Sequence, residues 1–424
     1  MRVNASLLAE GRVALYGHPM GSDASTATLP EPRGSAWSVL VVATRLGLTS
    51  FGGPVAHLGY FRREYVDRRR WVDDATFGDL VALSQLLPGP ASSQLGIAIG
   101  TLRAGYLGGL AAWIGFTLPS AVALIALAML TTSLDVASAG WVEGLKLAAV
   151  AVVVQAVWVM ARTLTPDLPR LAMAGLAAAV VLALPIAAVQ VVVIVVGGLI
   201  GWRFLSGAVA SGLTPITTSI GRRTGTVLLG VFAALVILLP LARRLVESQV
   251  VAMTDAYYRA GALVFGGGHV VLPLLNEAVV TPGWVGEDRF LAGYAATQAV
   301  PGPLFTFAGF LGASSSPAPN GVPGAVLALV AIFLPSFLLV WGTLPFWDRL
   351  RASTAFASAL RGTNAVVVGL LLAALITPVA TSALHGPLEV VLAGAGLAAL
   401  LTGRVPPIAV VAALALAGQL LDLG

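Results

Sequence analysis

The sequence predicts an all-α polytopic membrane protein that consists of two inverted-topology repeats joined by an extra transmembrane helix. Three observations predict this class: an apolar composition, an internal duplication, and an extra apolar stretch between the two copies. Hydrophobic residues make up 58% of the 424-residue chain and charged residues 10%, and the mean hydropathy is +0.92. A soluble protein carries about 25% charged residues, so this composition indicates the membrane class.

Charge and cysteine usage exclude several other classes. The formal net charge is +5, but the arginines stand mainly at the ends of apolar segments, where they determine topology. We therefore expect no nucleic-acid partner and a lipid bilayer as the surrounding medium. The chain has no cysteine, which excludes disulfides, thiolate metal ligands and cysteine nucleophiles. Residues 1–35 are polar and contain no signal-peptide core, so we expect a flexible cytoplasmic tail there.

An internal repeat defines the organisation of the chain. Motifs of the first half recur in the second half in the same order. They are, first copy then second, Arg45-Leu-Gly47 and Arg259-Ala-Gly261; Phe51-Gly52-Gly53-Pro54 and Phe265-Gly266-Gly267-Gly268; Pro88-Gly89-Pro90 and Pro301-Gly302-Pro303; Leu118-Pro119-Ser120 and Leu334-Pro335-Ser336. We predict one repeat over 36–204, a connector with the linking transmembrane helix over 205–249, and a second repeat over 250–424.

Each repeat contains about six apolar segments, and a membrane-spanning helix needs roughly 20 such residues. The segments are 36–61, 76–104, 106–132, 141–164, 170–185 and 187–204 in the first repeat, and 250–275, 289–312, 321–346, 354–380, 384–402 and 404–422 in the second. The extra apolar stretch, 224–242, lies between two arginine pairs. If each repeat crosses the membrane an even number of times, this span inverts the second repeat, an arrangement typical of secondary transporters.

The placement of arginines supports the inversion, because cytoplasmic loops are rich in arginine and lysine. The loop at 62–70 carries five arginines, whereas its counterpart at 276–289 is net acidic. A cytoplasmic N-terminus and a periplasmic or external C-terminus fit two models. In one model all thirteen segments cross; in the other the first two segments of each repeat are re-entrant hairpins. We favour the hairpins, because they leave the 62–70 loop in the cytoplasm.

Glycine and proline breaks lie deep in apolar sequence at equivalent positions of the two repeats. Broken backbone at membrane depth leaves N–H and C=O groups unpaired unless protein, water or a ligand satisfies them. Half-helix N-termini at such breaks present positive dipole ends that suit an anion. We therefore predict a substrate site at the breaks, with plain helix kinks as the alternative. Its residues are Gly52, Gly53, Pro54, Pro88, Gly89, Pro90, Gly266, Gly267, Gly268, Pro301, Gly302 and Pro303.

Arg45 and Arg259 are the predicted charge donors of this site. Each stands six residues before a glycine break, or roughly 9 Å along a helix. An intramembrane arginine is functional by default, and its planar fork fits a tetrahedral oxyanion. Snorkelling to the near interface is the alternative for both. Lys146 and its counterpart Arg361, with Asn364, are secondary candidates that could equally be interfacial anchors.

Paired histidines and glutamines complete the list of candidates. His57 and His269 follow the first break of each repeat and could bind an anion, carry a proton or cap local backbone. Gln85 and Gln298 precede the Pro-Gly-Pro motifs and could donate to substrate or satisfy broken backbone. The acidic pairs Asp73-Asp74 and Glu287-Asp288 each precede an apolar helix, which predicts N-terminal caps rather than a site.

In these motifs the sequence resembles the chromate ion transporter family. The resemblance is carried by residues 45–57, 85–90, 265–273 and 298–303. It covers residues 36–422 and the long, two-domain form of the family. It implies a bacterial inner-membrane exporter of chromate that confers chromate resistance, with sulfate as a mimic or alternative. The second repeat departs at Gly268, where the first has Pro54, and its histidine stands two positions earlier. The two halves need not contribute equally to the site.

Other classes of function find less support in the residues. A membrane-embedded enzyme is the rival from another class, but the four histidines are scattered, and no His-Glu-x-x-His pattern or Gly-x-x-x-x-Gly-Lys phosphate loop occurs. We expect no enzyme activity, no cofactor and no metal. A passive anion channel and a transporter of sulfate or another oxyanion stay open, because chromate and sulfate are similar tetrahedral dianions. A homodimer also stays open.

Overall fold

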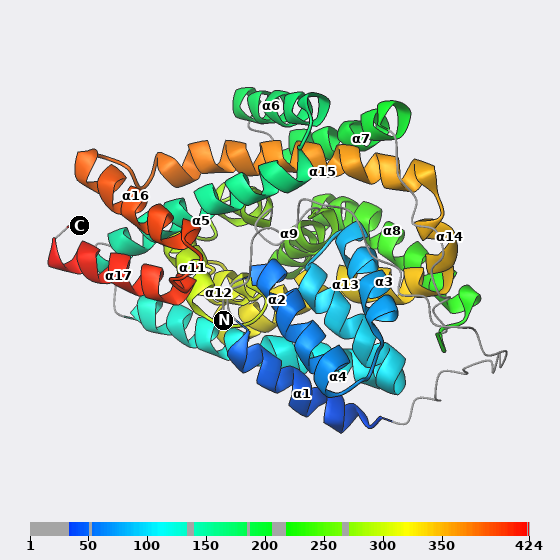
Figure 1. Ribbon diagram of the computed structural model, residues 1–424. Coiled ribbons are helices and arrows are strands. Elements are labelled where there is room, and N and C mark those ends of the chain that lie inside the picture. Colours follow the sequence, from blue (N-terminus) through cyan, green and yellow to red (C-terminus); the bar gives the residue numbers. More distant parts are fainter. Residues whose placement is uncertain are drawn as a thin grey trace, which may run out of the picture. The chain divides into compact units, whose positions relative to one another are not determined.

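The structure, a computed structural model, describes residues 34–50, 53–133, 140–184, 187–205, 218–264, 271–421 and 423. All regular elements in these ranges are helices, so the predicted all-helical class is confirmed (Figure 1). The predicted tail lies almost wholly outside the described residues. The same holds for Gly52, Gly266, Gly267, Gly268 and His269 among the predicted site residues.

The helices follow the predicted apolar segments. The first half contains α1 (Ala36–Thr49), α2 (Gly53–Phe61), the π-helix η2 (Arg62–Arg68), α3 (Asp74–Leu86), α4 (Ala91–Ser133), α5 (Gly140–Leu164), α6 (Leu168–Ala183) and α7 (Ala187–Phe204). The connector contributes α8 (Arg222–Leu245). The second half contains α9 (Gln249–Leu263), α10 (Val271–Leu275), η4 (Asn276–Val280), α11 (Glu287–Ala299), η5 (Leu304–Thr306), α12 (Phe307–Ala313), α13 (Gly321–Thr343), η6 (Leu344–Phe346), α14 (Trp347–Arg351), α15 (Thr354–Ala374), η7 (Leu375–Ala380), α16 (Pro387–Leu401) and α17 (Pro407–Leu420).

The first two apolar segments of each half are broken helices, as the glycine and proline motifs predict. α1 ends at Thr49 and α2 begins at Gly53, while α3 and α4 are separated by the first Pro-Gly-Pro motif. In the second half α9 ends at Leu263, and the second Pro-Gly-Pro motif follows α11. α3 has 13 residues, and a helix of that length is about 20 Å long, which is shorter than the roughly 30 Å hydrocarbon core. The choice between hairpins and full crossings stays a prediction.

A sharp turn divides α4 where the sequence predicts a boundary between two segments. Ala104 and Gly105 have non-helical backbone angles, and Gly105 has a φ of 64°. The helix folds back there, so that Gly100 packs against the backbone of Gly108 with no room for a Cβ atom. In the second half the same fold-back joins α12 to α13, where Gly312 meets Gly324. Both halves therefore place a short helix against the start of a long one.

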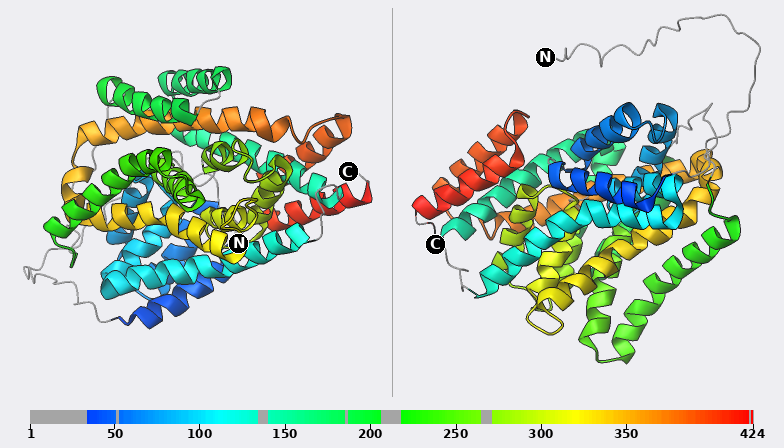
Figure 2. Two further views of the ribbon diagram at one scale, coloured as in Figure 1. Left: turned by 180° about the vertical axis from the view of Figure 1, so that it is seen from behind. Right: turned by 90° about the horizontal axis from the view of Figure 1, so that it is seen from below.

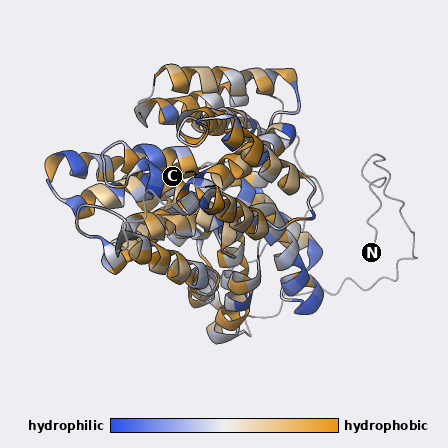
Figure 3. Ribbon diagram, turned by 90° about the vertical axis from the view of Figure 1, so that its left-hand side faces the viewer, coloured by the Kyte–Doolittle hydropathy of each residue, from blue (hydrophilic) through white to orange (hydrophobic). Residues whose placement is uncertain are grey.

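The outer helices present apolar side chains that suit a lipid environment. Five helices in the described ranges are long and apolar enough to cross a membrane, among them α5, α8 and α15. Most of the helical ribbon is hydrophobic (Figure 3). The connector helix α8 exposes Ile237 at 61% and Leu238 at 56% of their surface. Exposed leucines and isoleucines of this kind are expected in a helix that faces lipid.

The last two helices of each half pack against a long helix of the other half. α5 of the first half packs against α16 and α17, and α15 of the second half packs against α6 and α7. Both helix pairs approach through glycine: Gly144 lies on the backbone of Leu414, and Gly201 lies on that of Gly362. Small residues allow such close approach of membrane helices. α5 and α15 run in opposite directions in the views of Figures 1 and 2.

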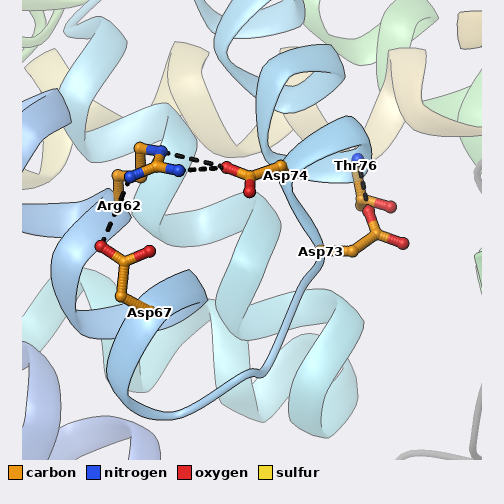
Figure 4. Close-up of polar contacts among 5 residues, drawn as sticks. All are labelled: Arg62, Asp67, Asp73, Asp74 and Thr76. Carbon is orange, nitrogen blue, oxygen red and sulfur yellow. Dashed lines mark hydrogen bonds and ion pairs between the residues drawn. The ribbon is translucent and has the colours of Figure 1, made fainter. Parts of the chain in front are cut away.

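The arginine-rich loop is ordered by carboxylates (Figure 4). Arg62 donates to Asp74 from Nε at 3.0 Å and from Nη2 at 2.8 Å, and its Nη1 lies 3.4 Å from Asp67. Asp73 caps α3 by accepting a hydrogen bond from the Thr76 amide at 2.7 Å. The prediction that this acidic pair is structural is confirmed.

The second acidic pair differs from the first. α11 begins after Gly286, which offers no side-chain cap, and Asp288 instead accepts a hydrogen bond from Lys146 at 2.9 Å. The prediction of an acidic cap was therefore wrong in this half. Glycine occupies the capping position, which leaves the carboxylate of Asp288 free to reach across to the other half of the chain.

Candidate anion-binding site at two crossed helix breaks

Each Pro-Gly-Pro motif contacts the residue that precedes the glycine break of the other half. The Gly89 amide donates a hydrogen bond of 2.6 Å to the carbonyl of Val264, the residue before the second break. The Gly302 amide donates one of 3.0 Å to the carbonyl of Ser50, the residue before the first break. We call these two sites the Val264 junction and the Ser50 junction. Segments that lie far apart in the sequence thus meet in two equivalent pairs.

Glycine is required at the centre of each Pro-Gly-Pro motif for two reasons. Gly89 has a φ of 121° and Gly302 a φ of 112°, which is backbone that other residues rarely adopt. A Cβ atom on Gly89 would lie 2.6 Å from Nε2 of Gln94 and 3.0 Å from Oγ of Ser336. A Cβ atom on Gly302 would lie 2.7 Å from Oγ of Ser120. These glycines therefore serve both backbone geometry and close packing.

Serine hydroxyls line both junctions. Ser120 and Ser336, from the repeated Leu-Pro-Ser motifs of α4 and α13, are buried against the two glycines. Ser120 donates to the Thr117 carbonyl at 3.1 Å. The hydroxyls of Ser336 and Ser50 are buried and have no hydrogen-bond partner within the described part of the chain. An unpaired buried hydroxyl costs about 1–3 kcal/mol, so a bound polar species is the expected partner.

A polar first turn of α4 adjoins the Val264 junction. Ser92, Ser93 and Gln94 are all buried there. Gln94 donates from Nε2 to the Pro88 carbonyl at 2.6 Å, while its Oε1 and the Ser93 hydroxyl have no partner among the described residues. Gln94 satisfies the broken backbone, a role that the sequence suggested for Gln85. Gln85 itself is exposed on α3.

His57 adjoins the Ser50 junction. Its ring is 1% exposed and packs against Phe61 and Phe116. Nε2 lies 3.2 Å from the Ser50 carbonyl, which the Gly302 amide also contacts. Nδ1 has no partner within the described residues. The ring therefore caps local backbone through one nitrogen and leaves the other available for a proton or a ligand.

Gln298 precedes the second Pro-Gly-Pro motif on α11. Its side chain is half-buried, and its Nε2 has no partner in the described part of the chain. Its side chain shares a hydrogen bond with Tyr294, which is fully buried in the same helix. Gln298 thus keeps an unused amide donor at the end of α11, whereas Gln85 does not occupy an equivalent buried position.

Arg45 and Arg259 line equivalent cavities beside the breaks. The repeat-1 cavity has a volume of about 390 Å³ and includes Arg45 and Thr49, the last residue of α1. The repeat-2 cavity has a volume of about 240 Å³ and includes Arg259 and Leu263, the last residue of α9. Each predicted arginine therefore lines a cavity that extends to the end of the helix before a break.

The two arginines differ in their partners. Arg259 forms a bidentate pair with Asp255, with Nε at 2.7 Å and Nη2 at 2.6 Å from its carboxylate oxygens. Arg243 of α8 lies 3.5 Å from the same carboxylate. Arg45 is exposed and has no ion-pair partner among the described residues. The planar fork of Arg259 is thus already occupied, whereas that of Arg45 is unpaired within the described part of the chain.

The repeat-1 cavity is bounded by the arginine-rich π-helix η2. Arg63, Glu64 and Arg68 line it together with Arg45. Glu64 binds Arg69 at 2.6 Å and Arg68 at 3.3 Å. Burial opposes the ionisation of Glu64, but the hydrogen bonds and charge of these two arginines outweigh it and lower the pKa of the carboxyl. Arg63 has no ion-pair partner in the described part of the chain.

The secondary candidates serve other contacts. Lys146 is 3% exposed, and its Nζ lies 2.5 Å from Glu143 and 2.9 Å from Asp288. It is a buried ion-pair partner that joins α5 to α11, and its part in a substrate site stays a prediction. Arg361 lies close enough to Asp167 to help lower the pKa of that exposed carboxyl, although Arg170 contributes more.

Asn364 keeps one unused polar atom. Its side chain is half-buried, and its Oδ1 has no hydrogen-bond partner among the described residues. It lies on α15 one turn after Arg361. Among the described residues it forms no hydrogen bond with the residues of either junction.

Sequence reasoning missed several of these residues. Ser120 and Ser336 were visible as repeat markers, and a hydroxyl conserved between two halves of one chain is the signal that could have singled them out. Gln94 and Asp255 have no counterpart in the other half, where Phe307 and Val41 stand at the matching positions. The comparison of the two halves therefore could not find them.

An all-helical fold with an apolar exterior, duplicated broken helices and buried polar junctions defines a multi-pass membrane transporter. The chain belongs to the chromate transporter family, whose family model matches residues 37–202 and 251–419. It is a family of transporters and not of enzymes. The two matched stretches indicate a duplicated domain. No solved structure matches the chain.

Curated relatives cover most of the chain. A chromate transport protein of Pseudomonas aeruginosa is 30% identical over 373 residues, which is 84% of this chain and 84% of the relative. A chromate transport protein of Cupriavidus metallidurans is 27% identical and covers 78% of this chain and 80% of its own length. A probable chromate transport protein of Synechococcus elongatus is 26% identical, with 78% and 81% covered.

Proposed function

We propose that this chain is a secondary transporter that exports chromate across the bacterial inner membrane and thereby confers chromate resistance. The observation that carries the proposal is the pair of crossed junctions: the amides of Gly89 and Gly302 hold the chain before each break, and the buried hydroxyls of Ser50 and Ser336 have no partner among the described residues. The names of the relatives in Pseudomonas aeruginosa and Cupriavidus metallidurans support chromate as the substrate.

The chemistry of the junctions suits an oxyanion. Bare oxygens of a dianion need donors when water is removed, because an unpaired buried charge costs on the order of tens of kcal/mol in an apolar medium. The unpaired hydroxyls and the N-terminal end of α4 supply such donors, and a helix N-terminus carries about half a positive charge. Full charges come from the arginines of the adjoining cavities. The predicted site residues at both breaks then form one path for the anion.

An inverted arrangement of the two repeats fits this path. The opposite directions of α5 and α15 support it, and so does the loop at 62–70, whose five arginines have an acidic counterpart. Because cytoplasmic loops are rich in arginine, we place this loop and the N-terminus in the cytoplasm and the C-terminus in the periplasm. The cavities of the two repeats then open toward opposite sides.

Transport by purified protein in liposomes tests the proposal. We expect uptake of labelled chromate that saturates with concentration and that depends on a pH gradient or another ion gradient. A flux that rises linearly with concentration would indicate a passive channel, and faster transport of sulfate than of chromate would favour sulfate as the substrate. Accumulation in inside-out vesicles reports the export direction, because their exterior is the former cytoplasmic face.

A matched serine pair connects this assay to the junctions. Ser336→Ala removes a hydroxyl without a partner, so we expect no loss of thermal stability but a KM for chromate that is about tenfold higher, as for the loss of one hydrogen bond to a charged group. Ser120→Ala removes a hydroxyl that already bonds Thr117 and serves as the control, with a smaller rise. Wild-type KM in Ser336→Ala would remove that hydroxyl from the site.

A further inference from the structure

The two arginine cavities are equivalent in position but not in charge. In the repeat-1 cavity, Arg45 and Arg63 have no ion-pair partner among the residues that the structure describes. The acidic side chain of this cavity, Glu64, is already bound to Arg68 and Arg69. The cavity therefore contains two guanidinium groups that are free to bind an anion.

The repeat-2 cavity is electrically balanced by its own carboxylates. Asp255 is fully buried beside it and binds both of its arginines, Arg259 through two contacts and Arg243 through one. Glu277 lines this cavity at the position that matches Arg63. An anion that enters here meets arginines that already have a partner.

One sequence difference accounts for most of this asymmetry. Asp255 stands four residues before Arg259 on α9, which places the two side chains on one face of the helix. The residue four positions before Arg45 on α1 is Val41. The first half thus lacks the internal carboxylate, and the fork of Arg45 stays free for an external one.

We propose that the repeat-1 cavity is the high-affinity binding site for the substrate oxyanion, and that Asp255 keeps the repeat-2 cavity in a low-affinity state by occupying Arg259. The inference rests on the proposed function, because it places both cavities on the path of the anion. Arg45 and Arg63 bind the dianion before it reaches the broken helix end at Thr49. At the other cavity the anion must compete with a bidentate carboxylate, so it is released there.

The chemistry of the substrate follows from the same contacts. Two guanidinium groups present planar forks that bind tetrahedral oxyanions through paired charge-assisted hydrogen bonds. A halide is a single atom and has no pair of oxygens to accept both hydrogen bonds of the fork. We therefore expect chromate and sulfate to bind the repeat-1 cavity more tightly than chloride does. The same experiment can include chloride as a probe.

The test transfers the carboxylate from one half to the other. Val41→Asp places an acid four residues before Arg45, and Val41→Asn provides a neutral control of the same shape. Val41 is 50% exposed, so neither substitution enters the packed interior. Sulfate and chromate binding to purified protein is measured by the rise in melting temperature with anion concentration, since a ligand that binds only the folded state raises it.

We expect Val41→Asp to weaken the binding of both oxyanions about tenfold relative to Val41→Asn, because the new carboxylate occupies Arg45. In the reverse direction, Asp255→Asn should lower the KM measured from the repeat-2 face about fivefold, again through release of one charged contact. Equal oxyanion affinity in Val41→Asp and Val41→Asn would overturn the inference even if Asp255→Asn does not fold.

Binding and transport separate this inference from the proposed function. Weakened sulfate binding in Val41→Asp, together with a wild-type protein that carries neither chromate nor sulfate, would support the anion site and contradict the transporter. Normal chromate transport in all variants, with unchanged KM from both faces, would leave the transporter in place and contradict the asymmetry of the cavities.

Discussion

The Ser50 junction and the Val264 junction share a backbone framework but differ in their side chains. In both, a Pro-Gly-Pro amide from one half binds a carbonyl before the break of the other half, and a serine of a Leu-Pro-Ser motif packs on the glycine. At the Ser50 junction the ring of His57 adds a second contact to the carbonyl. At the Val264 junction an amide, Gln94, binds Pro88 instead.

The difference extends to the helices that follow the two Pro-Gly-Pro motifs. α4 begins with Ser92, Ser93 and Gln94, whereas the matching positions after the second motif include Phe305 and Phe307, which are fully buried. A polar first turn can bind an anion and a phenylalanine cannot. Duplication has therefore preserved what the backbone requires, while the first turns after the two Pro-Gly-Pro motifs have diverged between the halves.

The central glycines are the most sensitive test of the shared framework. Gly89→Val and Gly302→Val each combine a positive φ with a Cβ atom less than 3 Å from a neighbour. We expect each to abolish chromate transport, because the crossed hydrogen bond cannot form around the larger side chain. Measured in the same liposomes, Gly230→Val on α8 serves as the control, since nothing lies within 4 Å of its added Cβ.

The two glycine variants also compare the junctions with each other. If only the Val264 junction carries substrate, Gly302→Val should retain part of the transport and Gly89→Val none. Full transport in both variants, with wild-type amounts of protein in the membrane, would reduce the crossed breaks to ordinary kinks.

The framework was predictable from the sequence, because it depends on motifs that occur twice. The repeated glycine and proline motifs predicted the breaks, and the positive φ angles of Gly89 and Gly302 explain why those residues recur. The crossing of the halves was not predictable. Nothing local in Pro-Gly-Pro indicates that its amide binds a carbonyl from the opposite half of the chain.

The contacts that differ between the halves were predicted less well, because no repeated motif marks them in the sequence. From the sequence alone Lys146 could equally be an interfacial anchor, because its ion-pair partner Asp288 lies far away in the sequence. The pairing of Arg259 with Asp255 lies within one helix and could have been read from the spacing of four residues. Val41 occupies the matching position of the first repeat, so the pair is not visible as a feature that the two repeats share.

A matched pair of cysteines tests the orientation of the two halves. Arg68 and Pro282 line the two cavities at matching positions of the repeats, and the chain has no cysteine to interfere. We expect an impermeant thiol reagent to label Arg68→Cys only from the cytoplasmic face and Pro282→Cys only from the periplasmic face. Labelling of Arg68→Cys from outside would instead support thirteen full crossings.

Arg45 and Arg259 allow a comparison of single side chains between the halves, since they stand at matching positions and differ in their ion-pair partners. Arg259→Ala leaves the buried carboxylate of Asp255 with only Arg243, so we expect a loss of about 3 kcal/mol in the free energy of unfolding. Arg45→Ala removes an exposed side chain without an ion-pair partner among the described residues, and we expect little change in stability. Thermal unfolding in detergent measures both.

Substitution by lysine then separates binding from snorkelling at Arg45. A bidentate clamp loses its fork in Arg45→Lys, so the KM for chromate should rise nearly as much as in Arg45→Ala, about tenfold. A side chain that only reaches for the interface should tolerate lysine, and the KM would then stay at the wild-type value. Normal chromate affinity in the Arg45→Ala, Arg259→Ala double variant would remove both arginines from the path. The charge that a dianion requires would then have to come from Arg63 and its neighbours on η2.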